Sequence, residues 1–177
     1  MGIGARSGDS EESRRDFEVF FRAHFYRLTQ YVGLRAPRAQ VDDVVAATFI
    51  VAWKKFRSVE NPSLPWLFRI ASFEVRSADR AARRSGRVVT VATMENVPIP
   101  DRDHFDGAAV LAALSRLSPA DQELLRLIHW DELTRREAAE VVGVTVNALN
   151  VRYHRALSKL EQQMSPITTA SPEGAPQ

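Results

Sequence analysis

The chain has 177 residues, of which 45% are apolar, and its 24 Lys and Arg nearly balance its 22 Asp and Glu. This length holds one domain or two small ones, and the apolar fraction suffices for packed cores. Because the chain has no cysteine, disulfide scaffolds, thiolate nucleophiles and Cys-ligated metal sites are excluded. No apolar run is long enough to span a membrane and the N-terminal segment is polar, so we expect a cytoplasmic protein without membrane insertion.

Three helices are expected in the N-terminal half, because apolar residues recur there at the spacing of one helix face. The predicted helices cover residues 13–32, 41–56 and 65–84. Ser13 is the expected N-cap of the first helix, and Gly33 the residue that ends it. The prolines of segment 61–65 separate the second helix from the third. Residues 1–12 are predicted to be disordered.

A linker is expected between the two halves of the chain. Residues 86–105 show no helical period and contain Gly86, Pro98 and Pro100. The segment 88–92 is compatible with a short extended piece, but one strand alone forms no sheet. Because so long an irregular segment is unusual inside one compact domain, it indicates two domains.

The C-terminal half repeats the helical pattern. A helix is expected over residues 106–115, further helices after Ser118 and Thr134, and a last helix to about Gln163. Ser118 is an N-cap followed by Pro119 at the first helical position. Thr134 and Glu137 have the spacing of a capping box, and Thr145 can cap the last helix. The tail, residues 165–177, is expected to be disordered.

The distribution of charge supports two modules with different faces. Residues 14–87 carry 15 basic and 7 acidic side chains, whereas residues 88–132 carry 3 basic and 8 acidic ones. Together with the helical periods, this predicts an all-α fold of two small helical domains joined by a flexible linker. No phosphate-binding glycine motif, nucleophile elbow or clustered metal-ligand spacing is present. We therefore expect no enzymatic activity, no catalytic residue, no metal and no cofactor.

Residues 133–156 have the pattern of a helix-turn-helix, with a short helix, a turn at Gly143 and a longer helix. Val146, Leu149, Tyr153 and Leu157 are the expected anchors of the second helix. Its outward residues are predicted to contact DNA: Asn147, Asn150, Val151, Arg152, Arg155 and Lys159. Side chains of these types read base edges in the major groove or hold phosphates. The alternative is an ordinary helical hairpin with a solvated charged face.

A second candidate surface lies on the helix predicted over residues 65–84. Its basic side holds Arg69, Arg76, Arg80, Arg83 and Arg84, with Phe73 on the same side. Arginine binds phosphate and an exposed ring stacks on a base, so this side is suited to unpaired nucleic acid. The alternative is that Phe73 packs against a neighbouring helix.

Two blocks of residues resemble one protein family. The first is Asp42-Asp43-Val44-Val45, with Phe49 and Trp53, followed by Trp66-Leu67-Phe68-Arg69-Ile70-Ala71. The second runs from Leu117-Ser118-Pro119 through Glu137-Ala138-Ala139-Glu140-Val141-Val142-Gly143-Val144 to Arg152 and His154-Arg155-Ala156. Residues 14–163 thereby resemble a bacterial extracytoplasmic-function sigma factor, the two-domain promoter-recognition subunit of RNA polymerase. Trp130-Asp131-Glu132-Leu133 is similar to a Trp-Glu-x-Leu segment found in one subset of that family.

The resemblance implies a role for each predicted domain. Residues 13–85 would be region 2, which binds the polymerase β′ clamp and recognises and melts the −10 element. Residues 106–164 would be region 4, which reads the −35 element on double-stranded DNA and contacts the β flap, and the linker would enter the active-centre cleft. The implied polymerase-binding residues are Asp42, Asp43, Ala46, Ala47, Phe49 and Ile50. An anti-sigma factor is a further partner that the family implies.

The chain departs from the family at a few positions. Gln and Glu are usual at the positions of Ala46 and Ala47, and many members have Asn and Asp at those of Phe73 and Ser77. Two alternatives stay open: a helix-turn-helix regulator, and an inactive sigma-like adaptor that titrates an anti-sigma factor. The regulator is disfavoured because a sensor domain has no need of the basic, aromatic surface in the N-terminal half.

Overall fold

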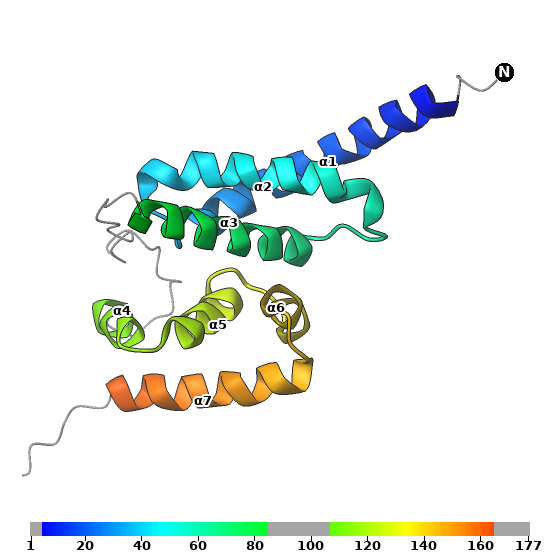
Figure 1. Ribbon diagram of the computed structural model, residues 1–177. Coiled ribbons are helices and arrows are strands. Elements are labelled where there is room, and N and C mark those ends of the chain that lie inside the picture. Colours follow the sequence, from blue (N-terminus) through cyan, green and yellow to red (C-terminus); the bar gives the residue numbers. More distant parts are fainter. Residues whose placement is uncertain (1–4, 85–106, 165–177) are drawn as a thin grey trace, which may run out of the picture.

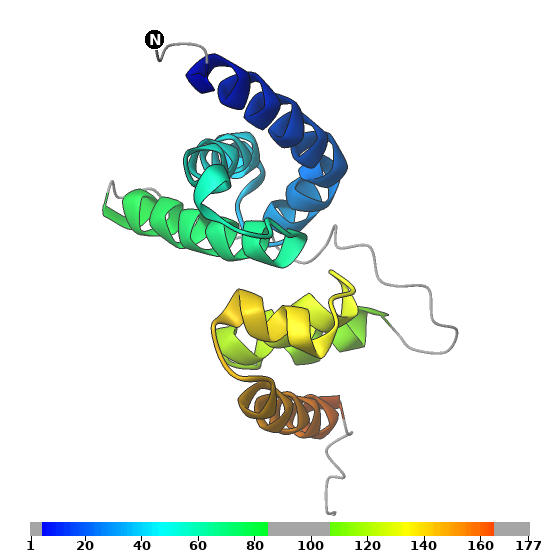
Figure 2. The same cartoon turned by 90° about the vertical axis from the view of Figure 1, so that its right-hand side faces the viewer.

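The computed structural model describes residues 5–84 and 107–164, and these ranges are helical without a β-strand. The helices are α1 (Ala5–Gly33), α2 (Val41–Lys55), α3 (Leu64–Arg84), α4 (Gly107–Ser115), α5 (Pro119–His129), α6 (Arg135–Val142) and α7 (Val146–Met164). Short 3-10 turns, Arg38–Gln40 and Phe56–Ser58, precede and follow α2. Both views show α1–α3 as one module and α4–α7 as a second (Figures 1 and 2). The prediction of an all-α fold with two helical modules is confirmed.

Several predictions concern segments that the structure leaves undescribed. The linker 86–105, its extended piece 88–92 and the tail 165–177 all lie outside the described residues. Within the described ranges, every helix is too short or too polar to cross a membrane.

The first helix is longer than predicted. α1 begins at Ala5, so Ser13 lies inside the helix and the expected boundary between residues 12 and 13 is wrong. No proline interrupts residues 5–12, and Glu and Arg are good helix formers, so the absence of apolar residues alone does not end a helix. α1 also includes Gly33, which lacks the positive φ expected of a residue that ends a helix.

Aromatic packing holds the first module together. Tyr31 of α1 stacks on Phe68 of α3, with ring centroids 4.2 Å apart, and both rings are fully buried. Phe17 lies edge-on to Phe56 and to Trp53, with centroids 5.1 and 4.9 Å away. Burial of rings this large dominates the stability of a small core. α3 is thereby fixed against α1 and α2 along its apolar side, which leaves its basic side outward.

Leucines form the core of the second module. Leu114, Leu125, Leu127 and Leu149 from α4, α5 and α7 are almost completely buried. The predicted N-cap of α5 is confirmed, because the Ser118 hydroxyl accepts a hydrogen bond from the third helical N–H. Buried apolar residues of both modules form one continuous cluster, in which α3 packs against α6.

Candidate nucleic-acid interface

Capping residues shape the helix-turn-helix formed by α6 and α7. The Thr134 hydroxyl accepts from the Glu137 N–H (3.3 Å), and the Glu137 carboxylate accepts from the Thr134 N–H (2.8 Å). The Thr134 hydroxyl also donates to the Glu137 carboxylate (2.6 Å), and this hydrogen bond, with that from the Thr134 N–H, holds the pKa of Glu137 below its ordinary value. Gly143 ends α6 in the left-handed conformation, with φ 78°, which favours glycine. Thr145 accepts from the Ala148 N–H (3.2 Å), so all three predicted features of this turn are confirmed.

The second helix of the motif is anchored one turn later than expected. Leu149 and Tyr153 are buried, as predicted, and Ala156 continues the same stripe. Val146 was an expected anchor but is 40% exposed, because the covered side of α7 starts at Leu149. Ala156 was missed, since a small side chain gives a weak signal of burial in a sequence.

The outward face of α7 carries the residues predicted to contact DNA. Asn147, Val151, Arg152 and Arg155 are exposed. Asn150 is half-buried, and its side-chain oxygen accepts from Arg135 of α6 (Nη1–Oδ1 3.3 Å).

One predicted phosphate contact of α7 has a partner within the chain. Lys159 forms an ion pair with Asp121 of α5 (Nζ–Oδ2 2.7 Å), and its hydrogen bond lowers the pKa of that carboxyl. Since the ammonium is half exposed, a phosphate can compete for it.

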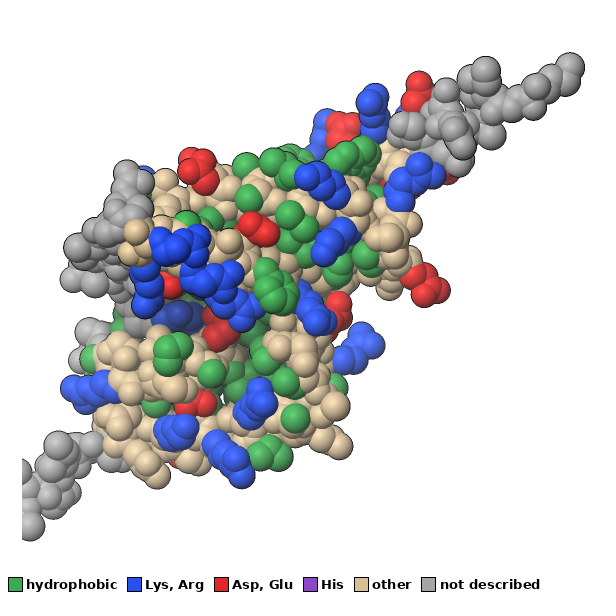
Figure 3. All heavy atoms as spheres, in the orientation of Figure 1, with side chains coloured by type: hydrophobic (Ala, Val, Ile, Leu, Met, Phe, Trp, Pro, Cys, Tyr) green, Lys and Arg blue, Asp and Glu red, His purple; other side chains and the backbone are tan. Residues whose placement is uncertain are grey.

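The basic side of α3 is exposed as predicted. Arg69, Arg76, Arg80, Arg83 and Arg84 all lie on the surface, and Lys and Arg gather over this helix in Figure 3. The Phe73 ring is 56% exposed, so its predicted outward position is confirmed. The Arg76 guanidinium lies 4.7 Å from the centre of that ring and donates to the Ser72 hydroxyl (3.1 Å). A cation and a ring are therefore presented together on one surface.

The residues expected to contact polymerase divide between surface and core. Asp42, Asp43, Ala46 and Ile50 are exposed and Ala47 is half-buried. Phe49 is 6% exposed, so its predicted place on a contact surface is wrong. Its ring packs against α1, with centroids 4.5 Å from Phe21 and 6.3 Å from Phe25, and supports the surface from beneath.

Several exposed apolar side chains of the first module were not predicted from the sequence. On α1, Val19, Phe25 and Tyr26 are exposed, and Trp53 of α2 is 41% exposed. The signal was present in the sequence, because the apolar stripe of α1 is wider than one buried helix face requires. Large apolar side chains that stay exposed on one module indicate contact with a partner.

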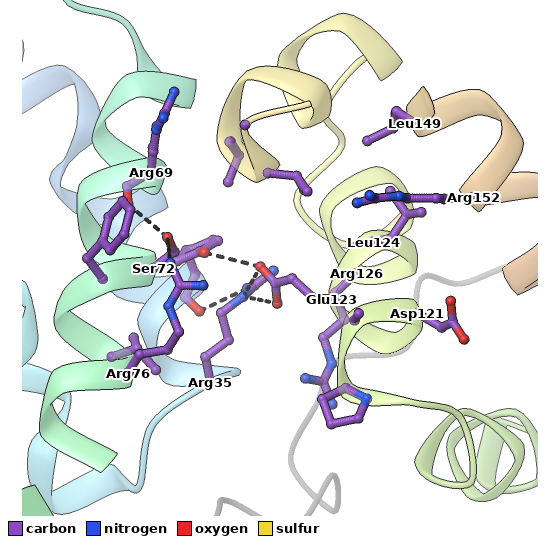
Figure 4. Close-up of a pocket in the computed structure, with 18 residues that line it drawn as sticks. Arg35, Arg69, Ser72, Arg76, Asp121, Glu123, Leu124, Arg126, Leu149 and Arg152 are labelled. Carbon is purple, nitrogen blue, oxygen red and sulfur yellow. Dashed lines mark hydrogen bonds and ion pairs between the residues drawn. The ribbon is translucent and has the colours of Figure 1, made fainter. Parts of the chain in front are cut away.

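A cavity of about 580 Å³ lies between the two modules (Figure 4). Its wall includes Arg69, Phe73 and Arg76 of α3 and, from the second module, Arg126 and Arg152. The structure therefore brings part of the predicted −10 surface and one predicted −35 residue to the same cavity. Among the described residues, no group of three or more His, Asp or Glu is arranged to hold a metal ion.

Comparisons with known proteins identify the family. Residues 107–160 match the family model described as "Sigma-70, region 4". The chain is 30% identical to RNA polymerase sigma factor NccH of Alcaligenes xylosoxydans xylosoxydans, over 70% of this chain and 73% of that protein. It is also 30% identical to RNA polymerase sigma factor CnrH of Cupriavidus metallidurans, over 84% and 86% of the two chains.

Solved structures agree with this result. CnrH in complex with the cytosolic domain of CnrY matches with a TM-score of 0.60 and 28% identity, over 84% of this chain and 87% of that one. The sigma factor RpoE from Bartonella quintana, in complex with the anti-sigma factor NepR, shares the fold with a TM-score of 0.63 at 24% identity, over 85% and 97% of the chains. The chain belongs to the extracytoplasmic-function sigma factors, non-catalytic initiation factors that direct core RNA polymerase to specific promoters.

Proposed function

We propose that the two modules of this sigma factor divide promoter recognition between them. The observation that carries this proposal is the outward face of α7, which lies inside the region 4 match and bears Arg152 and Arg155. Residues 106–164 act as region 4 and read the −35 element on double-stranded DNA. Residues 13–85 act as region 2, bind the polymerase clamp and open the −10 element.

On the −35 side, the N-terminal half of α7 enters the major groove. Asn147, Asn150, Val151 and Arg152 lie in this half, where a recognition helix contacts bases. Arg155 and Lys159 lie one and two turns further and hold phosphates, which adds affinity without sequence preference.

On the −10 side, the basic side of α3 binds the melted strand. Phe73 stacks on an unpaired base while phosphates lie along the basic residues Arg69, Arg76, Arg80, Arg83 and Arg84. The position of Arg76 next to the ring supports this assignment, because its guanidinium lies where it can bind the phosphate of the nucleotide whose base stacks on Phe73.

Core polymerase binds at two places in this proposal. The β′ clamp takes the α2 surface of Asp42, Asp43, Ala46 and Ile50, together with the exposed rings of α1. Region 4 contacts the β flap. The chain itself catalyses no reaction, needs no cofactor and acts in the cytoplasm, where its polymerase and DNA are.

An anti-sigma factor is a further partner. Support comes from CnrH, whose structure was solved in complex with the cytosolic domain of CnrY. Exposed rings on α1 and α2 offer such an inhibitor an apolar surface that polymerase also needs.

Co-purification with core polymerase followed by transcription in vitro tests this function. A sigma factor binds core in a one-to-one ratio and starts transcription from a dedicated promoter. An adaptor binds without starting transcription, and a separate DNA-binding regulator does neither. Either of the last two results overturns the proposal.

A further inference from the structure

We propose that the free protein holds itself closed through an interdomain clasp, consisting of Arg27, Arg35, Glu123 and Asp131. In the closed arrangement Arg69, Phe73 and Arg76 line the cavity between the modules, so a melted strand cannot lie along the whole basic surface of α3. The inhibition of strand binding rests on the proposed −10 function of α3, whereas the clasp rests on the contacts alone.

Arg35 is the centre of the clasp. Its side chain, only 5% exposed, forms ion pairs with Glu123 of α5 (Nε–Oε2 2.8 Å) and with Asp131 (Nη2–Oδ2 2.6 Å). Its remaining terminal nitrogen donates to the Tyr31 carbonyl (Nη1–O 3.0 Å), and the guanidinium lies 3.7 Å above the Tyr31 ring. One cation of the first module is thus paired with two carboxylates of the second, of which Figure 4 shows Glu123.

The turn after α5 is shaped for this contact. Glu132 adopts a positive φ of 54°, which is unfavourable for a residue with a side chain. In the same turn, the Asp131 carboxylate accepts a hydrogen bond from Arg35, and the Asp131 carbonyl accepts a short one from Arg27. Backbone strain of this kind persists where surrounding contacts demand it. This turn is the Trp130–Leu133 segment, and its Asp131 side chain serves neither DNA nor polymerase in the proposed function.

Burial limits the strength of the clasp. It raises the pKa of Asp131 above its ordinary value despite the attraction of Arg35, whereas the pKa of Arg35 is raised despite its burial, chiefly by Glu123. Desolvation of buried charges largely cancels the attraction between them. Such a contact fixes one arrangement of the modules and still opens when a partner binds the open form better.

Closure brings part of each proposed DNA-binding surface to one cavity. Arg69 of α3 lies against the turn of the second module, with Nη2 3.5 Å from where a Cβ on Gly143 would be. The cavity between Phe73 and Arg152 holds about 580 Å³, the size of a small-molecule pocket and too little for a nucleic-acid strand of several residues. Phe73 and Arg152, which line the same cavity, cannot at the same time contact −10 and −35 elements that are separated along the DNA. Opening is therefore needed before both promoter elements are bound.

A distance measurement tests the clasp without DNA. Since the chain has no cysteine, K54C and Q162C introduce a single pair of labels on exposed positions of α2 and α7. We expect one short distance distribution for the otherwise unchanged protein, and a longer, broader one for R35A. E123Q preserves the shape of the side chain and removes one charge. It should increase the distance between the labels, but less than R35A does. R22A is the matched control, because it breaks only the exposed Glu18–Arg22 pair of α1.

A second variant keeps the test valid if R35A does not fold. If circular dichroism shows that R35A is not folded, D131N opens the clasp from the other module and is measured in its place. A folded R35A or D131N variant that keeps the distribution of the unchanged protein overturns the clasp, whatever the DNA-binding role of α3.

A reversible lock tests the inhibition. The Ser63 hydroxyl of the first module donates to the Glu140 carboxylate of α6 (3.4 Å), so S63C and E140C can be joined by a short cleavable bismaleimide. We expect the locked protein to lose affinity for a fluorescent single-stranded −10 oligonucleotide and to regain it on cleavage. R35A should bind this oligonucleotide more tightly, on the order of tenfold for an open fraction of about one in ten. Equal binding by locked and cleaved protein overturns the inhibition.

If the locked and cleaved proteins both fail to bind any strand, the −10 assignment of α3 fails and the inhibition fails with it. The clasp is still judged by the label distances, so the two failures are distinguishable.

Discussion

Phe73 is a large apolar side chain on a basic helix face, where burial does not explain it. The ring is 56% exposed and has Arg76 beside it. Stacking of one base on such a ring contributes about 1–3 kcal/mol. We expect Phe73→Ala to lower affinity for a pre-melted −10 bubble by this amount, measured by fluorescence anisotropy, and to slow promoter opening on duplex DNA.

Folding supplies the control for this variant. An exposed ring contributes little to the core, so the free energy of unfolding should change by less than about 1 kcal/mol. Phe73→Trp keeps a stacking ring and should retain strand affinity. A loss of several degrees in the melting temperature of Phe73→Ala would show that the ring is structural.

Arg152 and Arg155 are both exposed on α7 but are expected to act differently. Arg152→Ala should lower the binding free energy for the −35 element by about 1–3 kcal/mol and relax the base preference at one −35 position, because it removes a base contact. Arg155→Ala should lower the affinity for all DNA sequences alike and reduce the salt dependence of binding, because it removes a phosphate contact. Binding to a −35 duplex library at two salt concentrations separates them. Equal loss of selectivity in both variants would contradict this division.

At the scale of residues, the sequence allowed Phe73 to be placed outward, because its neighbours Leu67, Ile70 and Ala71 define the buried side of α3. The same reasoning failed for Phe49. The resemblance to the family implied that Phe49 lies on a contact surface, but rings of α1 cover its side chain. Burial by another helix depends on tertiary packing, which the period of one helix does not report.

The capping box that begins α6 sets the geometry of the helix-turn-helix. Thr134→Ala should lower the free energy of unfolding by about 1 kcal/mol, measured by urea denaturation followed by circular dichroism, because a helix N–H loses its acceptor. Thr134→Ser keeps the oxygen and should remain close to the unchanged protein. A loss as large in the serine variant would assign the effect to the methyl group.

Glu137 gives this cap a pH dependence. Its pKa is lower in the folded chain than its ordinary value of 4.5, so folding favours the ionised form. Its contribution is therefore fully present above the unfolded pKa and is lost as pH falls through the folded one. The stability difference between the unchanged protein and Glu137→Gln should be largest near neutral pH and shrink in acid. A difference that is constant with pH would exclude this role.

At the scale of helices, caps were predictable and the beginning of α1 was not. Ser118, Thr134 and Thr145 interact with backbone a few residues away, so local sequence determines them. Residues 5–12 form about two polar turns of helix, which Gly8 disfavours but no proline stops, and Ser13 follows them inside α1.

At the scale of the molecule, the closed arrangement could not be read from the sequence. Arg35 and Asp131 are 96 residues apart, and neither belongs to a motif that pairs them. Charge sorting correctly indicated two modules, but it does not determine which surfaces meet. The basic side of α3 was predicted from its own period, while the cavity that it forms with Arg152 depends on packing of α3 against α6.

Docking to polymerase is the last property of the whole molecule that the surface predicts. Ala46 is exposed and Ala47 lines an open groove between α2 and α3, so longer polar side chains fit at both positions. The combined Ala46→Gln and Ala47→Glu variant restores the polar groups usual in the family. We expect it to bind core polymerase about fivefold more tightly, equivalent to ~1 kcal/mol, through new hydrogen bonds.

Competition against a second sigma factor for limiting core polymerase measures this gain. Ala109→Gln, at an exposed position of α4 away from the proposed clamp surface, is the matched control and should leave affinity unchanged. If the double variant binds equally or more weakly while remaining folded, polymerase does not use this part of α2. The exposed rings Phe25, Tyr26 and Trp53 are then the next residues to substitute, because they lie on the same module and are part of the proposed clamp surface.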